Sequence, residues 1–181
     1  MTFDMYIQIK SGVSMKTPIA GVDLTGTGTC AAFNLRRASR VVTQLYDAGL
    51  SPTGLRSTQF TILVATAKSQ PTPVGALAEL TLMDQTTMTR NLRLMVREGL
   101  IEVAARGAKR VKLVRLTKAG ERALAKAVPV WRATQERFLG AFGAGPWRDM
   151  RLALELAAGA AVETLRGPRA GVARADRNVV R

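Results

Sequence analysis

The chain has 181 residues, 47% of them hydrophobic and only 5% aromatic, so it is long enough for one domain with a sizeable core, and its Ala, Leu and Val content favours helices. Lys and Arg number 27 against 13 Asp and Glu, a formal net charge of +14, which attracts polyanions such as nucleic acids. The chain has no histidine and one cysteine, Cys30; it therefore cannot supply a His/Cys metal site, a Ser-His-Asp triad or an intrachain disulfide, and we expect no enzyme activity, no metal and no cofactor.

The first 28 residues show no helical period and end in the Gly/Thr-rich stretch DLTGTGT, which predicts a flexible N-terminal arm. Met15, which opens MKTPIAG, is a second candidate start of the protein. No apolar run approaches the roughly 18 residues that a membrane span needs, and the N-terminus lacks the apolar region of a secretory signal. We therefore expect a cytoplasmic protein.

From Thr29 onward, apolar residues recur at helical spacing and predict three helices in succession. The first is long and amphipathic and is expected to end at Gly49; its apolar face holds Ala31, Leu35, Ala38, Val42 and Leu45. Ser57 is the predicted N-cap of the second helix, whose shared face holds Phe60, Leu63, Val64 and Ala67. Thr72 and Pro73 are predicted as the N-cap and first residue of a short third helix.

The stretch MDQTTMTRNLRLMVREG, residues 83–99, reads as one helix with two different sides. Asp84 is the predicted N-cap and Gly99 the predicted end. Helical spacing turns Met88, Leu92 and Met95 inward, with Val96 beside them. The same spacing places an outward stripe of Thr86, Arg90, Arg93 and Arg97, flanked by Gln85 and Thr89.

The next segment predicts a two-stranded hairpin, in which LIEVA and VKLVRLT surround the basic turn ARGAKR. Thr117 is expected to cap a long helix that contains Pro129, which should bend it. GAGP then breaks the chain before a final helix that ends near Leu165. The basic, non-periodic tail, residues 167–181, is predicted to be disordered.

A short helix, a tight turn, a helix with a basic outer side and a hairpin with a basic tip together describe a winged helix-turn-helix. The predicted fold is therefore mainly α with a small β-hairpin wing, plus helical regions for dimerisation. Residues 84–118 carry nine basic residues against three acidic ones, and a helix of this kind fits the major groove of double-stranded DNA. The candidate DNA-binding residues are Gln85, Thr86, Thr87, Thr89, Arg90, Arg93, Arg97, Lys109 and Arg110. A nonspecific nucleic-acid-binding or architectural protein is the alternative, because a basic surface alone is sufficient for nonspecific binding to nucleic acid.

The segment AELTLMDQTTMTRNLRLMVREGLIE, followed by a basic turn and VRLTKAGE, resembles the signature of MarR-type transcriptional regulators. NLRRASRVVTQLYDAGLSPTGLRSTQFTIL resembles their first two helices. The resemblance covers roughly Thr29 to Leu165. It implies a homodimer in which residues 29–50 and 117–166 dimerise and the winged helix-turn-helix, residues 53–116, reads a pseudo-palindromic operator. It also implies a repressor that is released by a small aromatic or phenolic effector.

The resemblance places an effector pocket between the dimer helices and the winged lobe. Its candidate lining residues are Arg36, Tyr46, Phe60, Leu63 and Trp131, each of which is more readily explained as a core residue. Family wings commonly carry an acidic residue two places before a conserved arginine, but Ala108 stands two places before Arg110.

Organic-peroxide sensors of this family carry a reactive cysteine near the start of the first helix. Alignment on Phe33 places their cysteine at Ala32 and one partner tyrosine at Arg36, and only Tyr46 matches. An incidental thiol at Cys30 is therefore the favoured interpretation, and a redox-sensing regulator based on Cys30 is the alternative.

Overall fold

The computed structural model describes residues 21–24, 26–106, 108 and 110–167. Most of the predicted N-terminal arm and all of the tail from residue 168 lie outside the described residues. Helices dominate, and the elements in chain order are η1 (Thr27–Thr29), α2 (Ala31–Leu50), η2 (Ser51–Thr53), α3 (Ser57–Ser69), β1 (Thr72–Pro73), α4 (Val74–Thr81), α5 (Gln85–Arg97), β2 (Ile101–Arg106), β3 (Val111–Leu116), α6 (Lys118–Phe142) and α7 (Ala144–Arg166). One compact unit reaches Trp131 and a second begins at Arg132.

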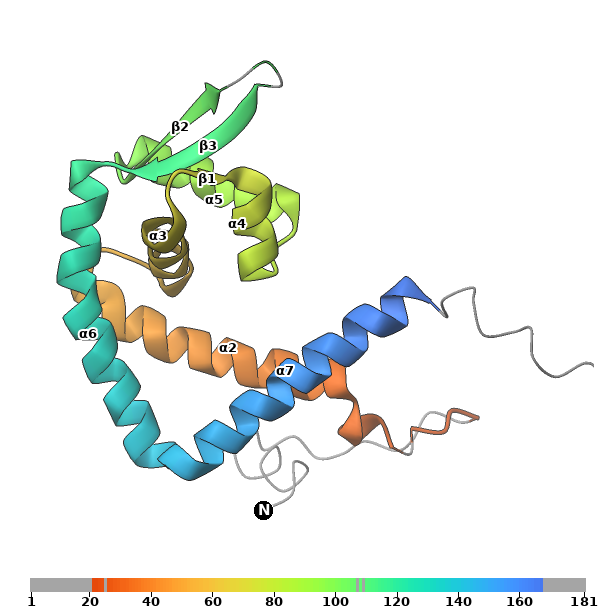
Figure 1. Ribbon diagram of the computed structural model, residues 1–181. Coiled ribbons are helices and arrows are strands. Elements are labelled where there is room, and N and C mark those ends of the chain that lie inside the picture. Colours follow the sequence, from red (N-terminus) through yellow and green to blue (C-terminus); the bar gives the residue numbers. More distant parts are fainter. Residues whose placement is uncertain (1–20, 25, 107, 109, 168–181) are drawn as a thin grey trace, which may run out of the picture. The chain divides into compact units, whose positions relative to one another are not determined.

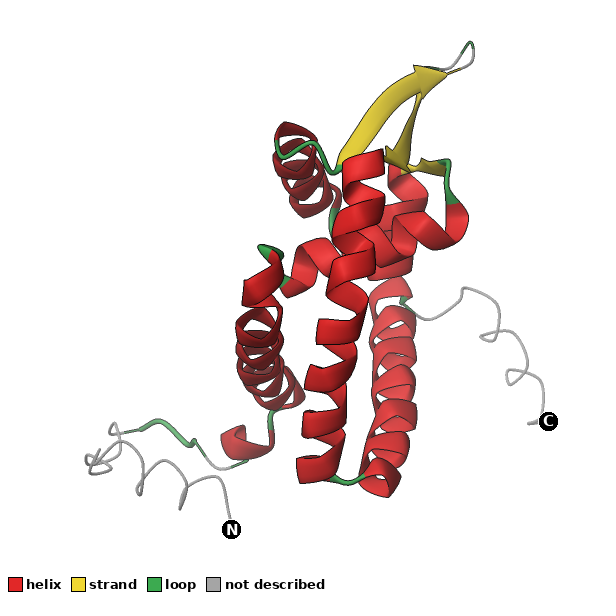
Figure 2. Cartoon of the chain, turned by 90° about the vertical axis from the view of Figure 1, so that its left-hand side faces the viewer, coloured by secondary structure: helices red, strands yellow, loops and turns green. Residues whose placement is uncertain are grey.

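The first unit contains a winged helix-turn-helix, as predicted. Figure 1 shows the strands β2 and β3 side by side, extending past the helices α3, α4 and α5 as the wing. The two strands pair antiparallel, from Ile101 opposite Leu116 to Arg106 opposite Val111. Figure 2 shows this hairpin together with a third, very short strand. The sheet order is β1-β3-β2.

The third strand corrects the prediction for Thr72 and Pro73. These two residues pair with β3 at Val114 and Leu113, and α4 begins only at Val74, with Pro73 in the N-cap position. Proline lacks an N–H group and is tolerated at the edge of a sheet. The side chain of Gln70 adds to this pairing, because its Oε1 accepts a hydrogen bond of 2.9 Å from the backbone N–H of Leu116.

The core of this unit lies between the three helices and the inner face of the sheet. Met88, Leu92 and Met95 are buried on the inner side of α5, as predicted. The other elements contribute buried apolar residues, among them Leu50, Ile62, Leu63, Leu77, Ile101 and Val114. Val96 differs from the prediction, since it is 43% exposed and is not one of the buried core residues.

Both predicted ends of α5 are confirmed. The Asp84 carboxylate accepts a hydrogen bond of 2.8 Å from the backbone N–H of Thr87. Hydrogen bonds with the side chain and the backbone of Thr87 hold the pKa of Asp84 below its usual value. At the other end, Gly99 has a φ of 69°, a left-handed conformation that glycine adopts without steric cost. The chain therefore turns directly from α5 into β2.

The start of α3 differs from the prediction. Ser57 is its first residue rather than its N-cap, and Gly49 lies inside α2, which ends at Leu50. The Asp47 carboxylate accepts hydrogen bonds from the backbone N–H of Ser57 at 2.7 Å and from its Oγ at 2.6 Å. A carboxylate on a neighbouring helix thus satisfies the first N–H group of α3, which a local cap usually does.

This contact predicts an acid-sensitive contribution to stability. Hydrogen bonds from the side chain and the backbone of Ser57 lower the pKa of Asp47, while burial partly opposes them. The contact therefore stabilises the folded chain fully above the ordinary carboxyl pKa of about 4, and the contribution is lost as the pH falls through the lower folded pKa. In the Asp47→Asn chain, the free energy of unfolding should therefore fall less steeply with pH between pH 6 and pH 3. Urea titration of both chains at several pH values in this range measures the difference. Parallel curves for the two chains would contradict the prediction.

Thr117 caps α6 as predicted. Its Oγ1 accepts a hydrogen bond of 3.0 Å from the backbone N–H of Gly120 and donates to the carbonyl of Gly99 at 2.6 Å. The start of α6 is therefore tied to the residue that ends α5. Pro129 lies within α6.

The second unit holds the end of α6 and α7. Phe138 stacks on Phe142 with ring centroids 5.6 Å apart and meets Trp147 edge-on at 5.6 Å. No apolar side chain among the described residues of this unit is fully buried, and Phe142 is itself 38% exposed. Large exposed apolar residues on α7 include Met150, Leu152, Leu154, Leu156, Val162 and Leu165. Nowhere in the described ranges does a helix combine the length and the apolar character that crossing a membrane requires.

Candidate nucleic-acid interface and ligand pocket

The outward side of α5 is polar and basic, as its spacing predicts. Arg90, Arg93 and Arg97 are exposed, and so are Gln85 and Thr86 in the first turn. Thr87 and Thr89 are half-buried. The buried Met88, Leu92 and Met95 fix the opposite side of α5 in the core, so the three arginine side chains cannot turn inward.

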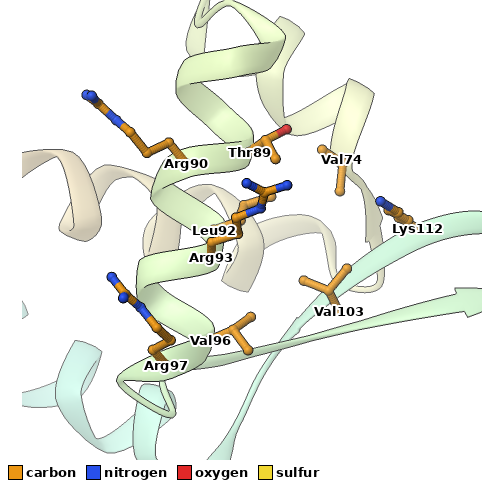
Figure 3. A pocket seen from close by; sticks show the side chains of 9 residues that line it. All are labelled: Val74, Thr89, Arg90, Leu92, Arg93, Val96, Arg97, Val103 and Lys112. Carbon is orange, nitrogen blue, oxygen red and sulfur yellow. The ribbon is translucent and has the colours of Figure 1, made fainter.

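A groove of about 550 Å³ lies between α5 and the wing. Figure 3 shows its apolar surface, formed by Val74, Leu92, Val96 and Val103, and the basic and polar side chains around it, which are Thr89, Arg90, Arg93, Arg97 and Lys112. Sequence reasoning did not select Lys112 as a site residue. The alternation of β3 holds the missing signal, because it places Lys112 on the same side as the buried Val114, one pleat further from the core.

The groove is strongly positive. No carboxylate is among its lining residues, and none forms an ion pair with Arg90, Arg93 or Arg97 in the part of the chain that the structure describes. Four cations at one groove without acidic partners attract a polyanion such as the phosphate backbone of DNA.

The tip of the wing is described only in part. Lys109 lies outside the described residues, as does Gly107. Arg110 is exposed and has a φ of 48°, a left-handed conformation that is uncommon for residues other than glycine. Ala108 is also exposed. Of the two predicted wing contacts, therefore, the structure places only Arg110.

A buried glutamine joins α5 to α3. The side chain of Gln59 is 4% exposed, and its Nε2 donates a hydrogen bond of 2.6 Å to the carboxylate of Glu98, directly after α5. Its Oε1 accepts from the backbone N–H of Arg56 at 2.9 Å. Gln59 thus fixes the end of α5 near Arg97, a role that a single glutamine in a helical pattern does not indicate.

A second cavity, of about 250 Å³, lies between α2, α3 and the middle of α6. Three of the five predicted effector-pocket residues line it, namely Tyr46, Phe60 and Trp131. Leu63 is fully buried in the core instead, and Arg36 is exposed on α2, ten residues before Tyr46. The remaining lining residues are Val42, Thr43, Leu50, Ser57, Thr58, Thr61 and Met83.

Two of the residues singled out from the sequence, Tyr46 and Cys30, lie in α2 or at its start. Burial raises the pKa of the Tyr46 hydroxyl above its ordinary value. Cys30 is an exposed free thiol in the N-cap position of α2.

The chain is similar to known regulators of transcription. A sequence model of the MarR family matches residues 48–110. The transcriptional regulator MosR of M. tuberculosis, solved in complex with DNA, is 39% identical, with a TM-score of 0.68 over 76% of this chain and 98% of that one. A probable transcriptional regulator from Pseudomonas aeruginosa is 28% identical, with a TM-score of 0.63 over 69% and 94%. AbsC, a MarR family regulator from Streptomyces coelicolor, shares the fold at 24% identity, with a TM-score of 0.64 over 81% and 99%. A search of curated proteins found no match.

Proposed function

This chain belongs to the MarR family of transcriptional regulators, which are not enzymes, and from that premise we propose that it is a sequence-specific repressor. In this proposal it binds double-stranded DNA at a pseudo-palindromic operator as a homodimer. A small molecule then releases it from the operator.

The unpaired basic side of α5 carries this proposal. Arg90, Arg93 and Arg97 are exposed along one side of the helix, and Lys112 lies across the groove. A helix of this diameter enters the major groove, where arginine and glutamine side chains reach base edges. Residues in its first turns, Gln85 to Arg90, are expected to contact bases, and Arg97 to contact phosphate. MosR, solved in complex with DNA, is the related structure that supports this proposal.

Exposed apolar side chains on α2 and α7 support the proposed homodimer. Phe33, Leu35 and Val41 on α2 are between 44% and 61% exposed, and Leu156 on α7 is 75% exposed. A second copy of the chain would remove these surfaces from water by symmetric pairing. Residues 29–50 and 117–166 would then form the dimer region and residues 53–116 the DNA-reading lobes. The two half-sites should lie about one helical turn, roughly 10 bp, apart.

The cavity at Tyr46, Phe60 and Trp131 is the proposed effector site. It adjoins the first turns of α3, and α3 is joined to the end of α5 through Gln59 and Glu98. A ligand that shifts α3 would therefore also shift the helix proposed to read DNA.

A footprint on the DNA upstream of the chain's own gene tests the proposal. A sequence-specific dimer should protect a palindrome whose halves are centred about 10 bp apart. Uniform, salt-sensitive protection of the whole fragment would contradict it and would favour a nonspecific nucleic-acid-binding protein.

A further inference from the structure

We propose that the cavity between α2, α3 and α6 binds a neutral, single-ring aromatic molecule that donates hydrogen bonds, and that it rejects carboxylates. This inference rests on the proposed function only in taking the cavity as the effector site. The binding chemistry itself follows from the side chains that line the cavity.

The first observation is the absence of a cation. None of the described residues that line the cavity is charged, although the chain as a whole carries a formal net charge of +14. A buried carboxylate without a cationic partner loses several kcal/mol, roughly, of hydration free energy. No charged side chain lines the cavity to offset that loss for an anion.

The second observation is the direction of two of the lining hydroxyl groups, those of Ser57 and Thr61. Ser57 Oγ lies 2.6 Å from the Asp47 carboxylate, and Thr61 Oγ1 lies 3.0 Å from the carbonyl oxygen of Ser57. Both partners can only accept, so both hydroxyls must donate their single proton to the protein. Towards a ligand, the Ser57 and Thr61 oxygens can therefore only accept hydrogen bonds. They can bind a ligand N–H or O–H group, and their lone pairs repel a carboxylate oxygen.

The third observation is the negative charge behind Ser57. The hydrogen bonds from Ser57 lower the pKa of Asp47, so this carboxylate is ionised at neutral pH. Its charge lies directly behind a lining hydroxyl. Arg56 is also close enough to Asp47 to lower its pKa, but Arg56 does not line the cavity, so the nearer carboxylate adds to the repulsion of an anion.

The aromatic walls and the volume limit the size of the ligand. The rings of Phe60 and Trp131 stack with centroids 5.7 Å apart and an interplanar angle of 21°. Aromatic side chains favour offset or edge contacts with a further ring. A cavity of about 250 Å³ is slightly below the usual range for drug-sized ligands, roughly 300–1,000 Å³. It therefore suits one substituted ring.

Two probes of nearly equal shape test the charge preference at pH 7.5. These are 4-hydroxybenzamide, which is neutral, and 4-hydroxybenzoate, which is an anion. Binding is followed by tryptophan fluorescence in a full-length Trp147→Phe chain, in which Trp131 at the cavity is the remaining tryptophan. We expect the amide to bind at least about tenfold more tightly than the carboxylate.

Two substitutions test the named groups. Thr61→Val removes one acceptor with little change of shape and should weaken the amide several-fold while leaving the carboxylate unchanged; Thr61→Ser, which keeps the hydroxyl, should bind like the parent chain. Thr43→Arg places a cation at the exposed side of the cavity and should reverse the preference in favour of the carboxylate.

Equal or tighter binding of the carboxylate by the Trp147→Phe chain would overturn the inference, and so would failure of both probes to change Trp131 fluorescence. Operator binding by the same chain is measured separately. A chain that binds its operator but shows no amide preference would refute this inference and leave the proposed DNA binding intact. A chain that prefers the amide but binds no operator would support this inference and refute the proposed DNA binding.

Discussion

Gly120→Ala should strongly destabilise the winged lobe, although it adds only one methyl group. Gly120 is buried in the first turn of α6. A Cβ atom at this position would overlap the backbone carbonyl oxygen of Leu100 and lie 2.9 Å from its carbonyl carbon. That carbonyl cannot move freely, because it accepts a hydrogen bond of 3.1 Å from the backbone N–H of Thr117.

The overlap is with backbone, so relief requires the start of α6 to move away from Leu100, the residue directly before β2. Overpacking of this kind costs about 3 kcal/mol, which corresponds to a fall in melting temperature of roughly 6–12 °C for a chain of this length. Urea unfolding at a fixed protein concentration measures the change.

Gly140→Ala is the matched control in the same helix. A Cβ atom at Gly140 would meet no heavy atom within 4 Å, and alanine has the higher helix propensity. This variant should be as stable as the wild-type chain or slightly more stable. Equal stability of the Gly120→Ala and wild-type chains would show that the start of α6 and Leu100 do not approach as closely as described.

Arg90→Ala should produce the largest loss of operator affinity. Arg90 is exposed on the outer side of α5, one turn after the N-cap region, where a side chain reaches base edges when the helix lies in the major groove. A lost arginine–base contact costs about 1–3 kcal/mol, and a homodimer loses it twice. We therefore expect operator affinity to fall at least about 30-fold, with relaxed specificity at one position in each half-site.

Arg97→Ala is the comparison for this prediction. Arg97 is the last residue of α5 and is expected to contact phosphate. Its loss should weaken binding to all duplexes alike and reduce the salt dependence of binding, by about one unit in the slope for each contact removed. If Arg90→Ala bound the operator as tightly as the wild-type chain, the proposed orientation of α5 would be wrong.

Features of the fold that depend on local pattern were predicted from the sequence. Spacing alone indicated the buried and exposed sides of α5, except at Val96. Asp84 and Gly99 indicated where α5 begins and ends, and Thr117 indicated where α6 begins. The prediction failed for β1, because two residues are too short to show the alternation of a strand. It failed for Ser57 because Asp47, ten residues away on another helix, satisfies the N–H group that a local cap was expected to satisfy.

The candidate sites divide in the same way. The arginines of α5 follow from helical spacing. The alternation of β3 places Lys112 on the same side as Val114, but only the structure shows that this position of β3 borders the groove beside α5. Tyr46, Phe60 and Trp131 come from three separate helices, and the resemblance to known regulators, not the residue pattern, brought them together. The direction of the Ser57 and Thr61 hydroxyl groups required the structure, because it depends on the acceptor that each one faces.

Reading of DNA sequence by α5 is tested most directly by a comparison of two duplexes. The dissociation constants of the full-length chain are determined side by side, at physiological salt, for the footprinted operator and for a duplex of the same composition with a shuffled sequence. We expect the operator to bind at least about 10³-fold more tightly, as specific DNA-binding proteins do. Equal affinities with the same dependence on salt would contradict sequence reading by α5 and leave only attraction between a basic surface and phosphate.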